Sequence, residues 1–438
     1  RRRATGGGGD YAPSVPASSN PDPRQGRSTL DHRSGLKICF VSMHTSPAAL
    51  PGTGDAGGMN VVERCQADAL ARLGHTVELV TRRSHPDDPD EVELMPGVVL
   101  HHVNAGPQTP LPKSAIDDHI EEFSAGLAAH CAPADIIHSH HWMSGVAALP
   151  VARAWGVPHV QSFHSVAALP GSPLSAGEPP ESPRRVPGEA LVAGESQAVV
   201  AISAAEAQTV IDRCGADAER VQIVSPGVDR ELFHPLEPGE QRWSWPAGAP
   251  AAWPSGYVLV AARLEPLKGP DLAIQALANL DPEIRPHLVV AGDASTAFAS
   301  YERELHAMVT ESGLADQVTF LGAQPRPELA RLLRGARVVL VPSHSETFGL
   351  IALEAAASGT PVIAASAGGL RESVAHGVTG QLMDSRRGED WALALTRLLM
   401  VPGLLERMSK VSRVHARRFD WGWTAQRLVS VYRGLIDA

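Results

Sequence analysis

Two carboxylates lie eight residues apart in a stretch that is otherwise mostly apolar. Glu346 and Glu354 belong to VVLVPSHSETFGLIALEAAASGTPVIAAS, residues 338–366. Glu354 sits among Leu353 and three alanines, so its carboxylate must reach solvent or meet a partner. Residues 343–349 lie at the N-terminus of a predicted helix, where backbone N–H groups suit a phosphate. The residues themselves favour neither a phosphate site nor an ordinary strand–helix–strand unit with a solvated acid.

The same stretch predicts the elements that would hold these carboxylates. Val338–Val341 and Pro361–Ala365 are short, branched and wholly apolar, which is typical of parallel strands buried on both faces. The segment between them, Thr347–Ser358, is rich in Ala, Leu and Glu and predicts a helix. Gly359 and Pro361 follow where that helix should end.

Length and composition limit the class of protein. A chain of 438 residues suits two domains of similar size, and 43% hydrophobic with 20% charged residues is typical of a globular protein. No apolar run is long enough to span a membrane, and a net charge of −10 argues against a nucleic-acid partner. The four cysteines show no CxxC spacing, which favours buried free thiols in a reducing cytoplasm.

The first half of the chain predicts an α/β domain over residues 36–235. Residues 1–35 are rich in Gly, Pro, Ser and Arg and are expected to be a disordered tail, without the apolar core of a secretory signal. A helix is expected over Met59–Leu73, closed by Gly74. The predicted strands, which alternate with helical patterns as in a parallel sheet, are Leu36–Ser42, Thr76–Arg82, Val98–Val103, Asp135–His140, Pro158–His164, Ala198–Ser203 and Val221–Val224.

A second α/β domain is predicted over residues 256–420, after a Pro- and Trp-rich linker at residues 236–255. Its predicted strands are Tyr257–Ala262, His287–Ala291, Gln317–Leu321, Val338–Val341 and Pro361–Ala365. Ligands of open α/β sheets bind beyond the carboxyl ends of the strands. The sequence therefore predicts two Rossmann-like domains that face a central cleft.

A glycine-rich turn precedes the first predicted helix. Residues 52–57, GTGDAG, match GxGxxG literally, but the first glycine comes about ten residues after the strand. The second strand ends in Thr81, Arg82 and Arg83, with no acid to hold a ribose, so an oxidoreductase is disfavoured. The turn still delivers backbone N–H groups and a helix N-terminus to the cleft.

The carboxylate stretch resembles the donor-site signature of retaining glycosyltransferases of family 4, which have the two-domain GT-B architecture. The resemblance rests on Glu346-x-Phe348-Gly349-Leu350, Glu354 and Ser358-Gly359-Thr360-Pro361-Val362. It implies that Glu354 binds the ribose hydroxyls of a nucleotide sugar and that residues 421–438 form a helix crossing back to the first domain. The donor-binding residues that it implies are Leu50, Pro51, Gly58, Arg263, Lys268, Gln324, Glu346, Gly349, Leu350 and Glu354.

Residues 44–60 further resemble the acceptor loop of those members that open mycothiol biosynthesis in actinobacteria. Those members transfer N-acetylglucosamine from UDP-GlcNAc to 1D-myo-inositol 3-phosphate, and many are homodimers. The acceptor-binding residues that this implies are His44, Asp55, Ala56, Gly57, Gly58, Met59, Asn60, Lys113, His141, Ser165, and Arg184 or Arg185. His141, Ser165 and Gln324 depart from Tyr, Thr and Arg of the pattern, and an imidazolium at His141 near pH 6 could join the phosphate contacts.

The resemblance also implies how transfer proceeds. Arg263 and Lys268 follow a strand directly and would offset the charge of the departing diphosphate, unless they only pair with Glu265. His164 and Glu346 complete the implied catalytic set, with no protein nucleophile. No cofactor is required, although Mg²⁺ could bind main-chain oxygens near Leu333, Arg334, Ala336 and Thr360. The alternatives are a family-4 enzyme with another acceptor, similar to sucrose-phosphate synthase, and a non-catalytic nucleotide-binding protein.

Overall fold

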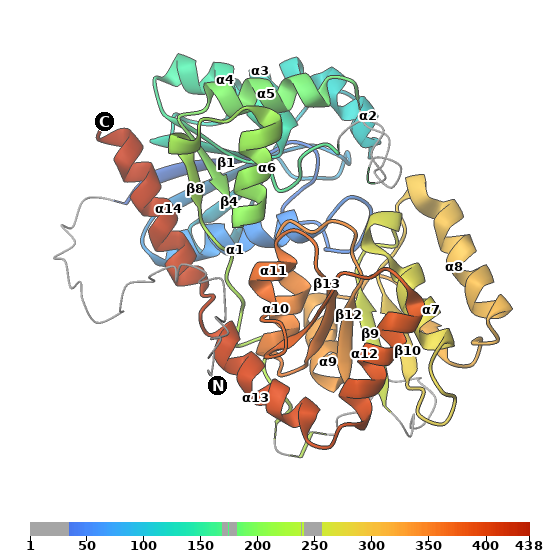
Figure 1. Ribbon diagram of the computed structural model, residues 1–438. Helices are drawn as coiled ribbons and strands as arrows, with labels where there is room; N and C mark the ends of the chain where they lie inside the picture. The colour runs from blue at the N-terminus through green and yellow to red at the C-terminus, as the bar shows by residue number, and fades with distance from the viewer. Residues whose placement is uncertain (1–34, 169–173, 175–181, 238, 241–255) are drawn as a thin grey trace, which may run out of the picture. The chain divides into compact units, whose positions relative to one another are not determined.

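The computed structural model describes residues 35–168, 174, 182–237, 239–240 and 256–438 (Figure 1). The predicted tail, apart from Gly35, and most of the predicted linker lie outside these residues. The described part contains two sheets flanked by helices, one in each half of the chain. The predicted α/β architecture is therefore confirmed.

The first sheet carries eight described strands in the order β3-β4-β2-β1-β5-β6-β7-β8. All neighbours pair in parallel except β3 and β4. The carboxyl ends of β1, β5 and β6 therefore meet at one edge, which is where the loops bearing His44, His141 and His164 begin. The strands are β1 Lys37–Ser42, β2 Thr76–Arg82, β3 Glu91–Met95, β4 Val98–Val103, β5 Ile136–His140, β6 His159–Ser162, β7 Ala198–Ala201 and β8 Val221–Ile223.

Helices cover both faces of this sheet because its strands are apolar on both sides. Alternate residues of β1 divide between two cores: Cys39 and Val41 pack on one face, Ile38 and Phe40 on the other. The first core includes α3 and α4, and the second includes α1 and the C-terminal helix α14. The helices are α1 Gly58–Arg72, α2 Lys113–Ile116, α3 Ile120–His130, α4 Trp142–Trp155, α5 Arg185–Glu195, α6 Ala204–Thr209 and α14 Trp421–Ile436.

The second sheet is parallel throughout, in the order β11-β10-β9-β12-β13-β14. Helices α7, α8 and α12 share a core on one face, and α9 and α10 share a core on the other. Its strands are β9 Tyr257–Ala261, β10 His287–Ala291, β11 Val318–Phe320, β12 Val338–Val341, β13 Val362–Ala365 and β14 Gly380–Met383. Its helices are α7 Pro270–Ala278, α8 Ala299–Glu311, α9 Arg326–Gly335, α10 Leu350–Ala357, α11 Leu370–Ser373, α12 Gly388–Met400 and α13 Leu404–Ala416.

Helix α10 begins three residues later than the composition of its segment predicts. Gly349 has φ +91°, a left-handed conformation that stops the helix from extending back to Thr347. A Cβ at this glycine would lie 2.5 Å from Cδ2 of Leu370 and 3.0 Å from Oγ of Ser373. The residues before Gly349 are therefore a loop, which leaves Glu346 free to face away from the helix axis.

Two strands are absent from the sequence prediction. Strand β3 pairs antiparallel with β4 at the sheet edge, and its EVELM sequence is too polar for the buried pattern used to find the others. Strand β14, GQLM, is only four residues long and opens with a glycine. Neither strand contributes a residue to the cleft described below.

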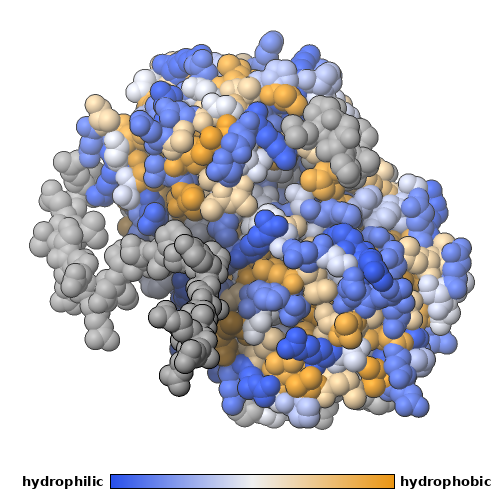
Figure 2. All heavy atoms as spheres, in the orientation of Figure 1, coloured by the Kyte–Doolittle hydropathy of each residue, from blue (hydrophilic) through white to orange (hydrophobic). Residues whose placement is uncertain are grey.

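No helix in the described ranges is long and apolar enough to cross a membrane. All four cysteines are free thiols, three of them buried. On the face that Figure 2 shows, hydrophobic residues are interspersed with hydrophilic ones.

Candidate active site

A cleft is lined by residues from both halves of the chain. Of the residues singled out from the sequence, it brings together His44, Pro51, Asp55, Gly57, Gly58, Met59, Lys113, His141, His164, Ser165, Arg185, Arg263, Lys268, Gln324, Glu346, Gly349, Leu350 and Glu354. Residues from distant parts of the chain thus meet in one place, as the strand-end rule for parallel sheets predicts.

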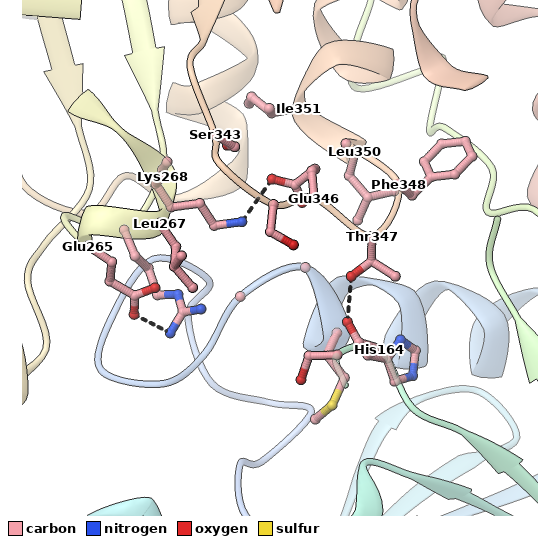
Figure 3. A pocket seen from close by; sticks show the side chains of 18 of the residues that line it. His164, Glu265, Leu267, Lys268, Ser343, Glu346, Thr347, Phe348, Leu350 and Ile351 are labelled. Atoms are coloured by element: carbon pink, nitrogen blue, oxygen red, sulfur yellow. Dashed lines mark hydrogen bonds and ion pairs between the residues drawn. The ribbon is translucent and has the colours of Figure 1, made fainter. Parts of the chain in front are cut away.

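Lys268 and Glu346 form an ion pair in the second domain's part of the cleft. Nζ of Lys268 donates to a carboxylate oxygen of Glu346 at 2.8 Å, as Figure 3 shows. Both side chains are about one-fifth exposed, at 22% and 18%. The backbone N–H of Gly369 donates to the Glu346 carbonyl at 2.9 Å and holds the loop in place. A lysine has three N–H donors, so it can bind this carboxylate and a ligand together.

Arg263 lies between two carboxylates. Its guanidinium pairs with Glu265 at 2.7 Å and approaches Oδ1 of Asp55 at 3.9 Å. The sequence analysis left open that Arg263 only pairs with Glu265 in a loop. That ion pair exists, but Arg263 also lines the cleft. Lys268 makes a different pair, across to Glu346.

Glu354 is buried in α10 and meets Arg326 at 2.9 Å. Burial raises the pKa of Glu354, and the neighbouring guanidinium opposes that rise. Arg326 also lies 4.8 Å over the ring of Phe233. The sequence analysis missed Arg326, although a carboxylate buried among alanines was a signal that a cation had to be near.

Lys113 and Arg185 lie in the first domain's part of the cleft. Nζ of Lys113 approaches Oδ1 of Asp55 at 3.9 Å, so Asp55 faces both this lysine and Arg263. Arg185 is buried, pairs with Glu189 at 2.8 Å and donates to Oγ of Ser165 at 3.4 Å.

Arg184 has a different environment from its neighbour Arg185. Its side chain is 61% exposed and faces Asp117 and Asp118, outside the cleft lining. Between the two arginines that the sequence left open, only Arg185 lines the cleft.

Asn60 shapes the acceptor loop from beneath the cleft. Its Oδ1 accepts from the Gly57 N–H at 2.8 Å, and its Nδ2 donates to Oγ1 of Thr45 at 3.1 Å and to the Ser46 carbonyl at 2.8 Å. These bonds tie the loop to the first turn of α1, whose N-terminus then opens toward the cleft at Gly57 and Gly58.

Two histidines in the cleft have left-handed backbones, which non-glycine residues seldom adopt. His141 has φ +71° and His164 has φ +58°. The His164 carbonyl accepts from Oγ1 of Thr347 in the second domain at 2.7 Å (Figure 3), and the Thr347 carbonyl accepts from Oγ of Ser203 at 2.6 Å. Such backbone strain persists where surrounding contacts hold it, and it is common at functional sites.

In the ligand-free protein, the surroundings of His141 oppose the imidazolium that the sequence analysis expected beside an acceptor phosphate near pH 6. Burial lowers its pKa well below the usual value, and nearby His44, Arg185 and Lys113 lower it further. Burial likewise lowers the pKa of His164 to about 3. Both imidazoles are therefore neutral at pH 6.

Four residues singled out from the sequence for substrate binding do not line the cleft: Leu50, Ala56, Asn60 and Arg184. Ala56 is buried, and its main chain closes the Gly52 turn, while Leu50 is 39% exposed. The residues considered for Mg²⁺, Leu333, Arg334, Ala336 and Thr360, also lie outside the lining.

The residues considered for Mg²⁺ do not form a fitting site. Oγ1 of Thr360 already donates to the Leu333 carbonyl at 2.6 Å, and Arg334 pairs with Glu240 at 2.7 Å. The set contains no carboxylate, whereas Mg²⁺ sites in proteins usually include one or two.

Comparisons with known proteins identify the class. Residues 57–227 match the model of the glycosyl transferase 4-like domain, and residues 243–415 match that of glycosyl transferases group 1. The chain is also similar in structure to sucrose-phosphate synthase from Thermosynechococcus elongatus, with TM-score 0.80 and 27% identity over 92% of this chain and 99% of that one. Fold and site define a glycosyltransferase with the GT-B fold, which is an enzyme and not a mere nucleotide-binding protein.

The relatives in sequence narrow this class to one family. The chain is 41% identical to a D-inositol 3-phosphate glycosyltransferase from Stackebrandtia nassauensis, over 92% of this chain and 93% of that protein. It is also 41% identical to one from Thermobispora bispora, over 92% and 95% of the two chains. The chain belongs to the D-inositol 3-phosphate glycosyltransferase family.

Proposed function

We propose that this enzyme transfers N-acetylglucosamine from UDP-GlcNAc to 1D-myo-inositol 3-phosphate with retention of anomeric configuration, as the first step of mycothiol biosynthesis. The names of its relatives support the acceptor, and the donor-site signature around Glu346 and Glu354 supports the nucleotide sugar.

The observation that carries the proposal is the gathering of cations around Asp55. Lys113 and Arg263 each lie 3.9 Å from the same Asp55 oxygen, one from each domain. Arg185 lies near as well, since Lys113, Arg185 and Arg263 all help lower the pKa of His44 after the larger effect of burial. This arrangement suits two phosphorylated substrates whose negative groups meet in one cleft.

In this proposal the second domain binds the donor. Glu354 accepts hydrogen bonds from the ribose hydroxyls, and its pairing with Arg326 holds the carboxylate in position. Arg263 and Lys268 meet the diphosphate, and Glu346 meets the sugar from the same loop that contacts Lys268. The N–H groups that begin α10 at Leu350 add to the diphosphate contacts.

The first domain binds the acceptor. Lys113, Arg185 and the N-terminus of α1 contact the acceptor phosphate, while His44, His141 and Ser165 contact the inositol ring. Since His44 and His141 are neutral, they offer one donor and one acceptor each to hydroxyl groups.

Transfer then takes place on one face of the sugar. The bond between the anomeric carbon and the diphosphate oxygen breaks, and a bond to an inositol hydroxyl oxygen forms on the same face. The hydroxyl proton moves to the departing phosphate oxygen. Negative charge grows on that phosphate as the bond breaks, so Arg263 and Lys268 stabilise the transition state more than the bound substrate.

No step of this mechanism passes through a metal. We place the enzyme in the cytoplasm, which its free thiols favour, and expect a homodimer, which analytical ultracentrifugation tests.

A second candidate acceptor is a hexose phosphate, because the sucrose-phosphate synthase structure is similar over nearly all of this chain. The test measures UDP release from UDP-GlcNAc with 1D-myo-inositol 3-phosphate, free myo-inositol or fructose 6-phosphate. We expect the highest kcat/KM for the inositol phosphate. Preference for fructose 6-phosphate would favour the second candidate, and equal use of both inositols would overturn a phosphate-specific acceptor site.

A further inference from the structure

Three side chains capable of binding a metal meet beneath the cleft floor. Glu63, His140 and His164 each place one ligand atom within 4.8 Å of the other two, in a search of the described residues. His140 ends β5 and His164 follows its parallel neighbour β6, so both come off the same sheet edge. Glu63 projects from α1, the helix that follows the adjacent strand β1.

The carboxylate of Glu63 lacks the partners that a buried charge needs. Its side chain is fully buried, and neither of its oxygens has a partner in good hydrogen-bond geometry. Burial raises the pKa of Glu63 well above its usual value, and the nearby Ser42 hydroxyl, which donates to the Thr45 carbonyl, opposes that rise only in part. Among the described residues, its only ion-pair contact is Nδ1 of His140, at 3.8 Å. A buried carboxylate without compensation is strongly unfavourable, so this position calls for a proton or a cation.

The two histidines offer nitrogens to the same point. Nδ1 of His140 lies 2.8 Å from Nε2 of His164, and their rings stack with an interplanar angle of 17°. The other ring nitrogens, Nε2 of His140 and Nδ1 of His164, are buried and have no hydrogen-bond partner. Only one of the two facing nitrogens can carry the shared proton, and that bond leaves Glu63 unsatisfied.

We propose that Glu63, His140 and His164 bind one divalent transition-metal ion, with Zn²⁺ as the best fit. Two imidazoles and one carboxylate are a ligand set that Zn²⁺ accepts, with a fourth position for water. At Zn–N distances of roughly 2.0–2.1 Å the two nitrogens would move apart by about half an ångström from their hydrogen-bond distance. The ion neutralises the buried carboxylate and replaces the bond between the two rings.

The ion would position His164 and would not take part in transfer. It holds the ring from below, while Thr347 holds the His164 carbonyl from the second domain. His164 lines the cleft, which gives the ion a route in. A bound metal ion would therefore link Glu63 and His140 in the first domain to the hydrogen bond between Thr347 and the His164 carbonyl, which joins the two domains.

The test uses the full chain after treatment with a chelator. Zn²⁺ is titrated by competition with a chromophoric chelator, and Co²⁺ is added separately to read its visible ligand-field absorption. We expect one Zn²⁺ per chain, a higher Tm with the metal, and Co²⁺ bands of a four-coordinate site. A chain that takes up no Zn²⁺ overturns the proposal and leaves a protonated Glu63 as the explanation.

Variants separate this site from other histidines and thiols. Glu63→Gln keeps the side-chain shape and removes a buried charge, so it should fold, and it should weaken Zn²⁺ binding more than about 100-fold. His140→Gln should do the same. The matched control is His159→Gln, another buried histidine, bonded to Ser139 and Ser196 instead, which should bind Zn²⁺ normally. Equal binding by Glu63→Gln and the unmodified chain would overturn the proposal.

Discussion

In the ligand-free enzyme, Lys268 is already paired: its Nζ lies 2.8 Å from a carboxylate oxygen of Glu346. The diphosphate must therefore bind to a lysine whose charge is partly neutralised, which limits its contribution to ground-state affinity. As negative charge grows on the leaving phosphate, the N–H groups of Lys268 interact with it more strongly than with the bound substrate. At the scale of single residues, this pairing favours transition-state binding over substrate binding.

Lys268→Ala should lower kcat more than it raises the KM for UDP-GlcNAc. Loss of a charged hydrogen bond costs about 1.5–3 kcal/mol, and most of that cost should fall on the transition state. Steady-state kinetics at saturating acceptor measure both constants. A rise in KM with unchanged kcat would instead assign Lys268 to uniform substrate binding.

Lys113→Ala should reduce the preference for inositol phosphate over free inositol, because only the phosphorylated acceptor can use a contact with this lysine. The matched control is Arg184→Ala, since Arg184 is exposed and lies outside the cleft lining. The measurement is kcat/KM for both acceptors in the three proteins. A larger loss of the preference for inositol phosphate in Arg184→Ala than in Lys113→Ala would assign the phosphate contact to Arg184 instead of Lys113.

At the scale of elements, the loop before α10 is held by close backbone packing. Gly349 ends the loop at φ +91°. The backbone N–H of Gly369, directly before α11, donates to the Glu346 carbonyl. A side chain at Gly349 would collide with Leu370 and distort the segment that carries Glu346. Donor binding and local stability are therefore coupled through this glycine.

Gly349→Ala should lower the free energy of unfolding by about 1–3 kcal/mol through left-handed strain, with a further cost for the contact with Leu370. Its KM for the donor should rise as well. Gly434→Ala is the control, because Gly434 lies in α14 with open space around it, and alanine favours helix there by about 0.5–1 kcal/mol. Urea unfolding compares the two, and equal stability of both variants would refute the packing argument.

At the scale of the whole molecule, the first domain buries an unusual set of neutral histidines. Among the described residues of this domain, burial lowers the pKa of His44, His75, His138, His140, His141, His159 and His164. His138 also accepts or donates a hydrogen bond with the Tyr432 hydroxyl at 2.7 Å, which links α14 to the first sheet. The C-terminal helix thus completes the core beneath the cleft.

The enzyme should lose stability as the pH falls from about 6.5 toward 3. His159 has a pKa of about 3 when folded and roughly 6.5 when unfolded, so in this window the unfolded chain binds the additional proton. Below about pH 6.5, each such histidine lowers the free energy of unfolding by up to roughly 1.4 kcal/mol per pH unit. Its contribution to stability is therefore fully present above about pH 6.5 and is lost on acidification. Urea unfolding at pH 7 and pH 5 measures the effect.

His159→Gln should have a smaller loss of stability between those two pH values than the unmodified chain, because glutamine does not titrate. It can still bond Ser139 and Ser196, the two partners of His159. An identical pH dependence in both proteins would show that His159 is not a source of the acid sensitivity.

The sequence alone determined the two-domain α/β architecture and most of its strands. Buried parallel strands must be apolar on both faces, so runs such as Val338–Val341 stand out without any tertiary information. The glycosyltransferase class followed from a resemblance, because the residues around Glu346 and Glu354 match the donor-site signature of that family. Edge strand β3 was not predicted, since a strand with an exposed side contains polar residues and lacks the apolar pattern.

Which side chains meet depends on the tertiary structure and could not be predicted from local sequence. Arg184 and Arg185 are adjacent in sequence, yet one turns to solvent and the other into the cleft, because successive residues at a helix start point in different directions. The pairs Glu354–Arg326 and Lys268–Glu346 join residues far apart in the chain. Desolvation decides the charge of His141 in the same way: it depends on every neighbour packed around the ring, which no local pattern contains.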